Sequence, residues 1–277
     1  AQPIAQVPIP FGGADGIYGI AFDPGFQENH FFYVFHTAPN PNRNRLVRFE
    51  DAGTTAANAT VILDNLPSGG HNGGKLAFGR DGNLFISGGD TGKPDLSQSL
   101  ETIVGKVLRI APDGSIPADN PIPGSPIYAR GFRNIYGLAV HPVSGALYGS
   151  DNGPDCDDEM NKIFPGGNYG WSLSEPCGDA NNAFVQPLVR INPVVGVTGL
   201  AFYQGAEFPE YDGHILLADF NGGAVRRYAI DDEKNVVLQE AIFYEGGAGS
   251  ITDLAVDAAG VVYATTTDAI VSLRRKM

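Results

Sequence analysis

Five copies of one short pattern run through this chain of 277 residues and constrain its fold more than any other feature. Each copy is an apolar segment containing an alanine, then a turn, then a second segment rich in aromatic or apolar residues, as in KLAFGRDGNLFIS and GLAVHPVSGALYGS. The aligned alanines are spaced by 56, 62, 62 and 54 residues, and they are Ala21, Ala77, Ala139, Ala201 and Ala255. Repeats of this length built from short strands are typical of a β-propeller, in which each repeat forms one blade.

Each of the first four copies continues with two more strand candidates, which gives four strands per repeat. These candidates are Arg45–Glu50, Thr60–Leu63, Lys106–Ala111, Ile127–Arg130, Met160–Phe164, Pro187–Ile191, Ala224–Ile230 and Ala241–Tyr244. No segment keeps an apolar period of 3.6 residues, and the best helical candidate, Asp95–Ile103, is short. The sequence therefore predicts an all-β fold of four-stranded blades.

The fifth copy holds three strand candidates, which are Ile251–Asp257, Val261–Thr266 and Ala269–Arg274. We expect the N-terminal segment Ile4–Pro10 to add the fourth strand of this last blade, because closing the ring removes two free sheet edges. This gives a single propeller domain over residues 1–277 with five blades. The alternative is a six-bladed ring that has lost one blade. The polar loop over residues 113–126 is expected to project from one face rather than to mark a domain boundary.

The charge of the chain restricts its partners. A net charge of −13 argues against binding to nucleic acid or to an anionic membrane, since both require clustered Lys and Arg. No apolar run reaches the about 20 residues of a membrane span. Because the chain begins Ala1-Gln2, we expect a processed product. Oligomeric state is left open.

The two cysteines, Cys156 and Cys177, flank one turn rich in Gly and Asn. We expect a structural disulfide rather than a metal-binding or reactive pair, because neither a CxxC motif nor a Cys/His spacing is present. Such a bond would contribute about 3 kcal/mol in the chain-entropy description of a loop this size. It also predicts an oxidising compartment, so that the protein would be secreted or periplasmic.

Four segments carry a resemblance to a known family. They are GGHNGGKLAFGRDGNLFISGGD (69–90), GKVLRIAPDGSIPADNP (105–121), GFRNIYGLAVHP (131–142) and DNGPDCDDEMNKIFPGGNYGW (151–171). The chain resembles the soluble PQQ-dependent glucose/sorbosone (aldose sugar) dehydrogenases, which are β-propellers, from about Gly16 to the C-terminus. Members normally have about one more blade ahead of the segment GIYGIAFDP. The resemblance implies oxidation of an aldose at C1 by hydride transfer to PQQ, with Ca²⁺ as a second cofactor.

The resemblance assigns roles to three residues around the quinone. His71 matches the histidine that acts as general base, and an imidazole suits this role because it titrates near neutral pH. Arg133 and Asn134 match a pair that contacts the quinone, and a guanidinium fork suits a carboxylate or quinone oxygen. Without the resemblance, His71 reads equally as a loop cap and Arg133 as a partner of one of the many carboxylates.

A calcium region is implied by the segment that follows Asp151. Gly153 and Pro154 match residues whose carbonyl groups hold the calcium of the cofactor, and Asp157, Asp158, Glu159 and Tyr169 match a second calcium position. Carboxylates and carbonyls are hard oxygen ligands suited to Ca²⁺. The alternative is a solvated acidic loop.

Several positions depart from the pattern of the family. Uncharged residues stand where the family has charged, amide or aromatic groups around the cofactor, and they are Ala14, Asn192, Asn221, Ser250 and Thr252. PQQ carries three carboxylates, and buried carboxylates without a partner are costly.

These departures leave three hypotheses. The first is a PQQ- and Ca²⁺-dependent aldose dehydrogenase. The second is a non-catalytic, Ca²⁺-stabilised propeller that binds a carbohydrate or a protein. The third is a metal-dependent lactonase or hydrolase built on the acids that end the second strands, which are Asp90, Asp151, Asp219 and Asp268.

Overall fold

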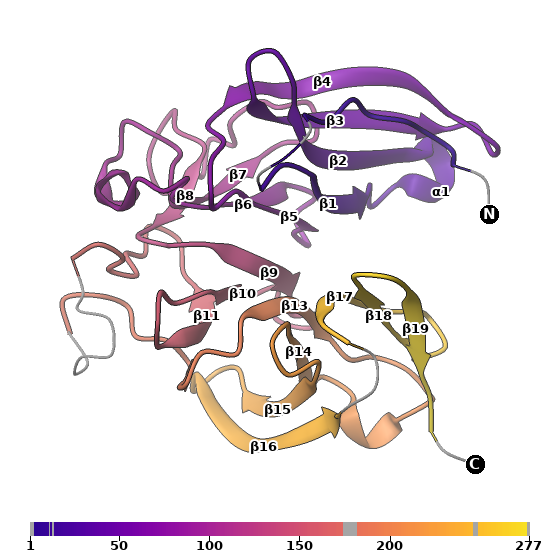
Figure 1. The fold of residues 1–277 in the computed structure, drawn as a ribbon, viewed down its shortest axis with the longest axis vertical. Coiled ribbons are helices and arrows are strands. Elements are labelled where there is room, and N and C mark those ends of the chain that lie inside the picture. The colour runs from indigo at the N-terminus through magenta and orange to yellow at the C-terminus, as the bar shows by residue number, and fades with distance from the viewer. Residues whose placement is uncertain (1–2, 11, 13, 174–181, 246–248, 276–277) are drawn as a thin grey trace. The chain divides into compact units, whose positions relative to one another are not determined.

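The fold is an all-β propeller of five blades, seen here in a computed structural model (Figure 1). The structure describes residues 3–10, 12, 14–173, 182–245 and 249–275. The chain divides into two compact units, one formed by residues 1–134 and 165–173 and the other by residues 135–164 and 174–277. Unit 1 and unit 2 are described separately below.

Unit 1 contains the first two sheets, and both are antiparallel with strands in chain order. The first sheet consists of β1 (Ile17–Phe22), β2 (Phe31–Ala38), β3 (Arg43–Asp51) and β4 (Ala56–Leu66), and the second of β5 (Gly73–Phe78), β6 (Leu84–Gly88), β7 (Lys106–Ile110) and β8 (Ile127–Arg130).

Unit 2 contains the other three sheets. They are β9 (Ile135–Val140), β10 (Leu147–Asp151), β11 (Asp158–Ile163) and β12 (Val189–Ile191); then β13 (Val197–Phe202), β14 (Ile215–Asp219), β15 (Val225–Asp231) and β16 (Val236–Tyr244); then β17 (Ile251–Val256), β18 (Val262–Thr266) and β19 (Ile270–Leu273).

The repeated alanine motif is the first strand of each blade, as predicted. Three of the five copies have a glycine two residues before the alanine, and the close approach of neighbouring first strands within a unit explains it. A methyl group on Gly19 would lie 2.3 Å from the carbonyl oxygen of Gly74, and one on Gly137 would lie 2.4 Å from that of Thr198. At Gly199 the nearest atom would be the nitrogen of Leu254, at 2.4 Å. Because these neighbours are backbone atoms, no side-chain movement could make room for a larger residue at these positions.

Apolar side chains join adjacent blades face to face. In unit 1, Tyr33 and Leu46 of the first sheet pack on Leu84 and Ile110 of the second. In unit 2, one cluster joins the third and fourth sheets and another joins the fourth and fifth. The middle strands β7, β10 and β14 are buried at every position, so each of these sheets is covered on both faces, as blade packing requires.

The N-terminal segment does not close the last blade, so that part of the prediction was wrong. Among the described residues, Ile4–Pro10 forms no strand, and the fifth sheet has three strands. The carbonyl of Ile4 instead accepts a hydrogen bond from the N–H of Ala56, and Val7 packs against the cluster that contains Phe32 and Phe49. This segment thus covers the apolar outer part of the first sheet.

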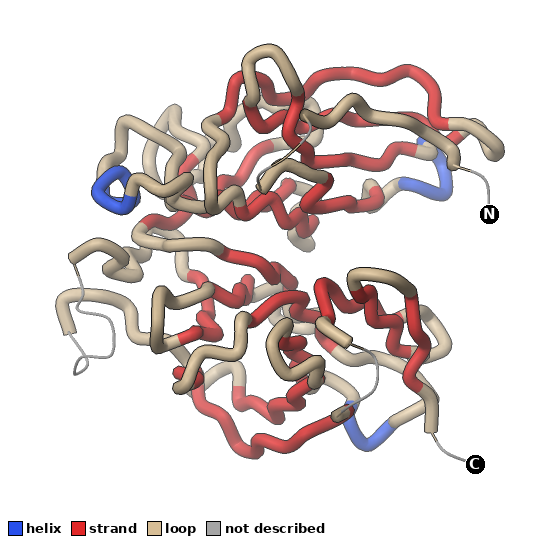
Figure 2. The backbone as a smooth tube through the Cα atoms, in the orientation of Figure 1, coloured by secondary structure: helices blue, strands red, loops and turns tan. Residues whose placement is uncertain are grey.

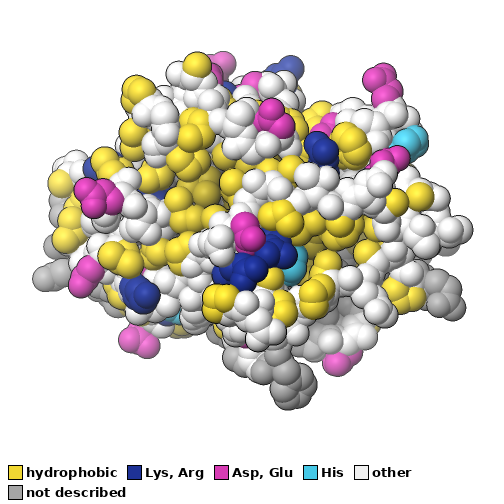
Figure 3. All heavy atoms as spheres, turned by 90° about the horizontal axis from the view of Figure 1, so that it is seen from above, with side chains coloured by type: hydrophobic (Ala, Val, Ile, Leu, Met, Phe, Trp, Pro, Cys, Tyr) yellow, Lys and Arg dark blue, Asp and Glu magenta, His cyan; other side chains and the backbone are white. Residues whose placement is uncertain are grey.

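Helix is confined to short segments in the described part of the chain (Figure 2). They are α1 (Phe26–Asn29) and the 3₁₀ segments η1 (Pro94–Gln98) and η2 (Pro209–Tyr211). The predicted helical segment Asp95–Ile103 is reduced to η1. None of the described helices has the length and apolar character needed to cross a membrane. On the face drawn in Figure 3, basic side chains are few and form no continuous surface.

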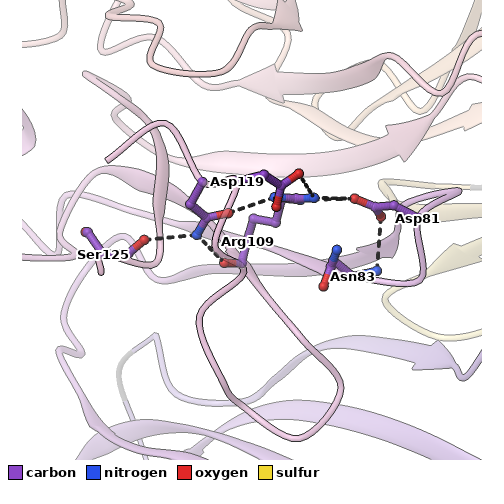
Figure 4. A network of polar contacts seen from close by, with 6 residues as sticks. Asp81, Asn83, Arg109, Asp119 and Ser125 are labelled. Carbon is purple, nitrogen blue, oxygen red and sulfur yellow. Dashed lines mark hydrogen bonds and ion pairs between the residues drawn. The ribbon is translucent and has the colours of Figure 1, made fainter. Parts of the chain in front are cut away.

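A buried arginine holds the loop over residues 111–126 (Figure 4). The Arg109 guanidinium donates to both carboxylate oxygens of Asp119, at 2.9 and 3.0 Å, and to Asp81 on the turn before β6. It also donates to Asn120 Oδ1, while the Asn120 amide donates back to the carbonyls of Arg109 and Ser125. The network ties this long Pro- and Gly-rich stretch to β7 and to the turn before β6.

Replacement of Arg109 by methionine is expected to lower the free energy of unfolding by about 2 kcal/mol, because a buried charged donor is lost and Asn120 Oδ1 is left without its partner. The loss stays modest since the side chain of Asp119 is 75% exposed and can be hydrated. Urea unfolding measures the change. The exposed Lys234, which pairs with Asp231, serves as control, because Lys234→Met should shift stability by less than about 0.5 kcal/mol. Equal losses for both variants would contradict the role given to Arg109.

Candidate functional site

A histidine and an aspartate form a closely bonded pair in unit 1. His71 Nδ1 lies 2.7 Å from Asp90 Oδ1. The Asp90 side chain is 1% exposed, whereas that of His71 is 27% exposed. An ionised carboxylate only accepts hydrogen bonds, so the proton of the neutral imidazole lies on Nδ1. The Nε2 atom of His71 is then the one with a lone pair available to accept a proton.

The backbone around this pair fixes both residues. His71 precedes β5 and Asp90 follows β6. The carbonyl oxygen of His71 accepts a hydrogen bond from the N–H of Thr91 at 2.9 Å. A methyl group on Gly89 would lie 2.4 Å from that same carbonyl oxygen, so the two strands can approach this closely only with glycine at position 89. The motif GGD therefore brings Asp90 beside His71.

Asp90 is held in its ionised form. Burial raises the pKa of its carboxyl group, but hydrogen bonds from His71, Gly92 N–H and the Trp171 indole oppose burial and leave the pKa below its ordinary value. Trp171 Nε1 donates to Asp90 Oδ2 at 2.8 Å. Both oxygens of the carboxylate are thus occupied, and the carboxylate cannot turn away from His71.

Arg133 lies beside this cluster. Its guanidinium carbon is 5.7 Å from the centre of the Trp171 ring, in a cation–π contact. Its carbonyl oxygen accepts a hydrogen bond from the N–H of Asp90 at 2.8 Å. The structure therefore brings together His71 and Arg133, two of the residues singled out in the sequence.

Asn134 is the last residue of unit 1 before β9. Its Oδ1 accepts a hydrogen bond from the N–H of Gly73 at 3.2 Å, and its backbone forms a bridge with Gly89. These contacts place the Asn134 side chain next to the residues that carry His71 and Asp90.

Asp158, predicted as a calcium ligand, accepts hydrogen bonds from backbone groups in unit 2. Its Oδ1 atom accepts from Gly153 N–H at 2.9 Å. Its Oδ2 atom accepts from Val195 and Gly196 at 2.7 Å each, and from Val197 at 3.3 Å. A buried carboxylate that receives backbone donors at both oxygens anchors the turn before β13.

The other acids of this segment face different neighbours. Asp157 has a left-handed backbone conformation and pairs with Arg190, at 3.2 Å. Glu159 lies directly opposite Asp151 across β10 and β11, and it accepts a hydrogen bond from Asn161 at 3.1 Å. Burial and the carboxylate of Asp151 raise the pKa of Glu159 to about 7. Asn161 Oδ1 is buried and has no hydrogen-bond partner among the described residues.

Tyr169 and the cysteines complete the predicted site residues. Tyr169 is buried in unit 1, where its ring stacks on Phe132 with centroids 4.4 Å apart. Gly153 and Pro154 belong to unit 2, as does Cys156, which is buried. The predicted disulfide joins Cys156 to Cys177, and Cys177 lies outside the described residues.

The acids proposed for a lactonase site do not form a metal cluster. Asp90 is bonded to His71 and Trp171, and Asp219 accepts hydrogen bonds from Gly222 and Ala224 in its own turn. Asp268 is exposed and bonded to Thr267. Within the described ranges, no group of three or more His, Cys, Asp or Glu side chains could hold a metal ion.

Two members of the cluster around His71 were not assigned to it from the sequence. Asp90 was noted only as an acid at the end of a second strand, and Trp171 only as the last residue of the segment 151–171 that carries the family resemblance. The signal that could have found Asp90 was the spacing of HNGG and GGD across one strand pair, because residues just before the first strand and just after the second strand of a hairpin are neighbours in space.

Comparison with known proteins identifies the family of this chain. The sequence model for glucose / sorbosone dehydrogenase matches residues 1–275. The chain belongs to the glucose/sorbosone dehydrogenase family. Within it, the chain is 35% identical over 206 residues to the quinoprotein glucose dehydrogenase B of Acinetobacter calcoaceticus, covering 61% of this chain and 43% of that protein. It is 28% identical over 292 residues to the aldose sugar dehydrogenase YliI of Escherichia coli, covering 96% and 78% of the two chains.

A solved structure of the family has the same fold. The PQQ-bound aldose sugar dehydrogenase of Streptomyces coelicolor superposes with a TM-score of 0.84 at 30% identity, covering 96% of this chain and 78% of that one. The chain spans 63% of the length of an uncharacterized Synechocystis relative and 43% of the Acinetobacter protein.

Proposed function

We propose that the protein is an aldose sugar dehydrogenase that oxidises a sugar hydroxyl, with His71 as the group that accepts the hydroxyl proton. The observation that carries this proposal is the 2.7 Å contact between His71 Nδ1 and a buried, ionised Asp90. Relatives named as glucose and aldose sugar dehydrogenases support the substrate class.

The paired carboxylate has a defined task in this reaction. Asp90 keeps the proton of the neutral imidazole on Nδ1 and stabilises the imidazolium that forms when Nε2 takes a second proton. Trp171 and Gly92 hold the carboxylate in place while the charge on the ring changes. A fixed base of this kind typically contributes a factor of about 10²–10⁴ in rate.

The residues around the His71–Asp90 pair have some of the charge that binding of an anionic quinone requires. Bound PQQ would supply the hydride acceptor. Arg133, held beside Trp171 and next to Asp90, would hold a carboxylate or quinone oxygen through its guanidinium fork. In the sequence, the uncharged residues Asn221, Ser250 and Thr252 stand where the family has one Lys and two Arg. We therefore expect a lower affinity for PQQ than a site with additional Lys or Arg would have.

The oxygen groups of unit 2 fit a hard cation. Glu159 and Asp151 repel one another, and the unpartnered Asn161 Oδ1 lies on the same strand face as Glu159. A divalent cation would relieve both the repulsion and the unsatisfied oxygen. The carbonyls of Gly153 and Pro154 would hold the separate calcium ion that the resemblance assigns to the cofactor. Asp158 is not among these ligands, because backbone N–H groups donate to both of its carboxylate oxygens.

Titration of the protein with PQQ and CaCl₂, followed by dye-linked oxidation of an aldose panel, tests the proposed function. We expect saturable PQQ binding at micromolar concentration and dye reduction that requires PQQ, calcium and an aldose together. Absence of PQQ binding in this range would overturn the proposal. Binding of sugars without PQQ would then favour a carbohydrate-binding module, and opening of a sugar lactone without PQQ would favour a lactonase.

A further inference from the structure

We propose that Gln98 is a positioning residue for the His71–Asp90 pair, acting through Trp171. Gln98 ends η1 in the loop between β6 and β7. The inference rests on the proposed function for its catalytic consequence, but its structural part concerns one hydrogen bond that can be observed without activity.

The amide nitrogen and the amide oxygen of Gln98 both bind the segment 168–171, which carries Trp171. Its Nε2 donates to the carbonyl oxygen of Trp171 at 2.8 Å, and its Oε1 accepts from Asn168 Nδ2 at 2.9 Å. The same segment is tied to the end of β8 by the backbone bond from Trp171 N–H to Gly131 O, at 3.0 Å. The peptide groups on both sides of Trp171 are thereby fixed, and with them the direction in which the indole projects.

The Trp171 indole connects this held segment to the His71–Asp90 pair. Trp171 Nε1 donates to Asp90 Oδ2, whose other oxygen contacts His71. If the Trp171 carbonyl shifts, the indole N–H moves relative to a carboxylate that is almost fully buried. The carboxylate then has one donor fewer to hold its plane, and His71 loses part of its orientation.

A buried lysine holds Gln98 itself in place. The Lys106 side chain, on β7, is fully buried, and its ammonium donates to the carbonyls of Leu96, Ser97 and Val104 at 3.0, 2.9 and 2.5 Å. Burial and the charge of Arg130 lower the pKa of Lys106 to about 8, so the group is still protonated at neutral pH. Three carbonyls around one ammonium compensate its burial and fix η1 to the sheet.

Two substitutions separate this role from general stability. Gln98→Ala removes both hydrogen bonds, and Gln98→Glu keeps the acceptor for Asn168 but faces the Trp171 carbonyl with a carboxylate oxygen. Asn120→Ala is the matched control, because Asn120 is a buried amide of unit 1 that also donates to two carbonyls but lies in the Arg109 network. Urea unfolding establishes that each variant unfolds cooperatively.

The single tryptophan supplies the direct measurement. Its indole N–H gives one NMR resonance in protein labelled with ¹⁵N-tryptophan, and that proton is donated to Asp90. Both Gln98 variants are expected to shift this resonance and to exchange its proton about tenfold faster, equivalent to loss of one hydrogen bond of about 1.4 kcal/mol. Asn120→Ala should leave the resonance and its exchange unchanged.

Kinetics then test the catalytic consequence. In the PQQ-loaded protein, both Gln98 variants should lower kcat about tenfold with KM changed less than twofold, while Asn120→Ala leaves both unchanged. An indole signal that is the same in wild type and both Gln98 variants would overturn the inference, whether or not the protein oxidises sugars. A shifted signal with unchanged kcat would overturn its catalytic part. If wild type lacks activity, the NMR result still decides the structural part, and the failure belongs to the proposed function.

Discussion

Replacement of His71 by glutamine is expected to lower kcat for aldose oxidation by a factor of about 10³, because glutamine can still donate to Asp90 but cannot accept a proton. KM for the sugar should change less than threefold, since the amide fills nearly the same space. Steady-state dye reduction at saturating PQQ and calcium measures both quantities. A kcat within fivefold of wild type would show that another group takes the proton.

Asp90→Asn completes this test. Its amide would present N–H groups toward His71 Nδ1 and favour the tautomer with the proton on Nε2, which removes the basic lone pair from the substrate side. A comparable reversal in a serine protease costs about 10⁴ in kcat. His141→Gln is the matched control, because His141 Nδ1 accepts hydrogen bonds from the N–H groups of Val143 and Ser144 in its own turn of unit 2 and takes no part in the dyad. Its kcat should equal that of wild type.

Replacement of Asp158 by alanine is expected to cost about 3–5 kcal/mol in the free energy of unfolding, because four backbone N–H groups lose their acceptor. Urea unfolding at neutral pH measures this loss. Asp157→Asn is the control: asparagine tolerates the left-handed conformation at this position, and the lost ion pair with Arg190 should cost less than about 1 kcal/mol.

The same variants distinguish a calcium ligand from a backbone anchor. If Asp158 anchors the turn, Asp158→Ala retains whatever increase in Tm calcium gives to the wild-type protein, although its Tm is lower throughout. Glu159→Gln should abolish that increase, since Glu159 belongs to the oxygen set proposed to hold the ion. Loss of the calcium-dependent increase in Asp158→Ala, with Glu159→Gln unaffected, would contradict both assignments.

The repeat made the architecture predictable from the sequence. A glycine, an apolar residue and an alanine recur where the first strands of neighbouring blades approach backbone to backbone, and this steric requirement leaves a visible motif at Gly19, Gly137 and Gly199. Strand positions followed from the repeated apolar segments and the turns between them, and Ile127–Arg130 agrees residue for residue with β8. Strand β16 was predicted to begin at Ala241 but begins at Val236, and its first residues are mostly exposed although three of them are apolar.

The N-terminal segment and the acidic segment were harder to predict. Ile4–Pro10 has the composition of an edge strand, but its contact with Ala56 depends on the outer face of the first sheet, which no local pattern reports. Three consecutive acids suggested one calcium site, yet neighbouring residues in an extended chain point in opposite directions. Asp158 therefore turns to backbone donors and Glu159 to Asp151. The pairing of His71 with Asp90 was implicit in the hairpin geometry, whereas the Trp171 and Gln98 contacts join segments far apart in sequence.

The carbonyl groups around Lys106 resemble the oxygen shell that proteins place around a bound metal ion, but the cation at their centre is part of the chain. It cannot dissociate on dilution, and a chelator cannot remove it. At neutral pH the loop that supports Trp171 therefore keeps its internal charge at any salt concentration. We therefore expect depletion of calcium to leave the histidine and its aspartate assembled.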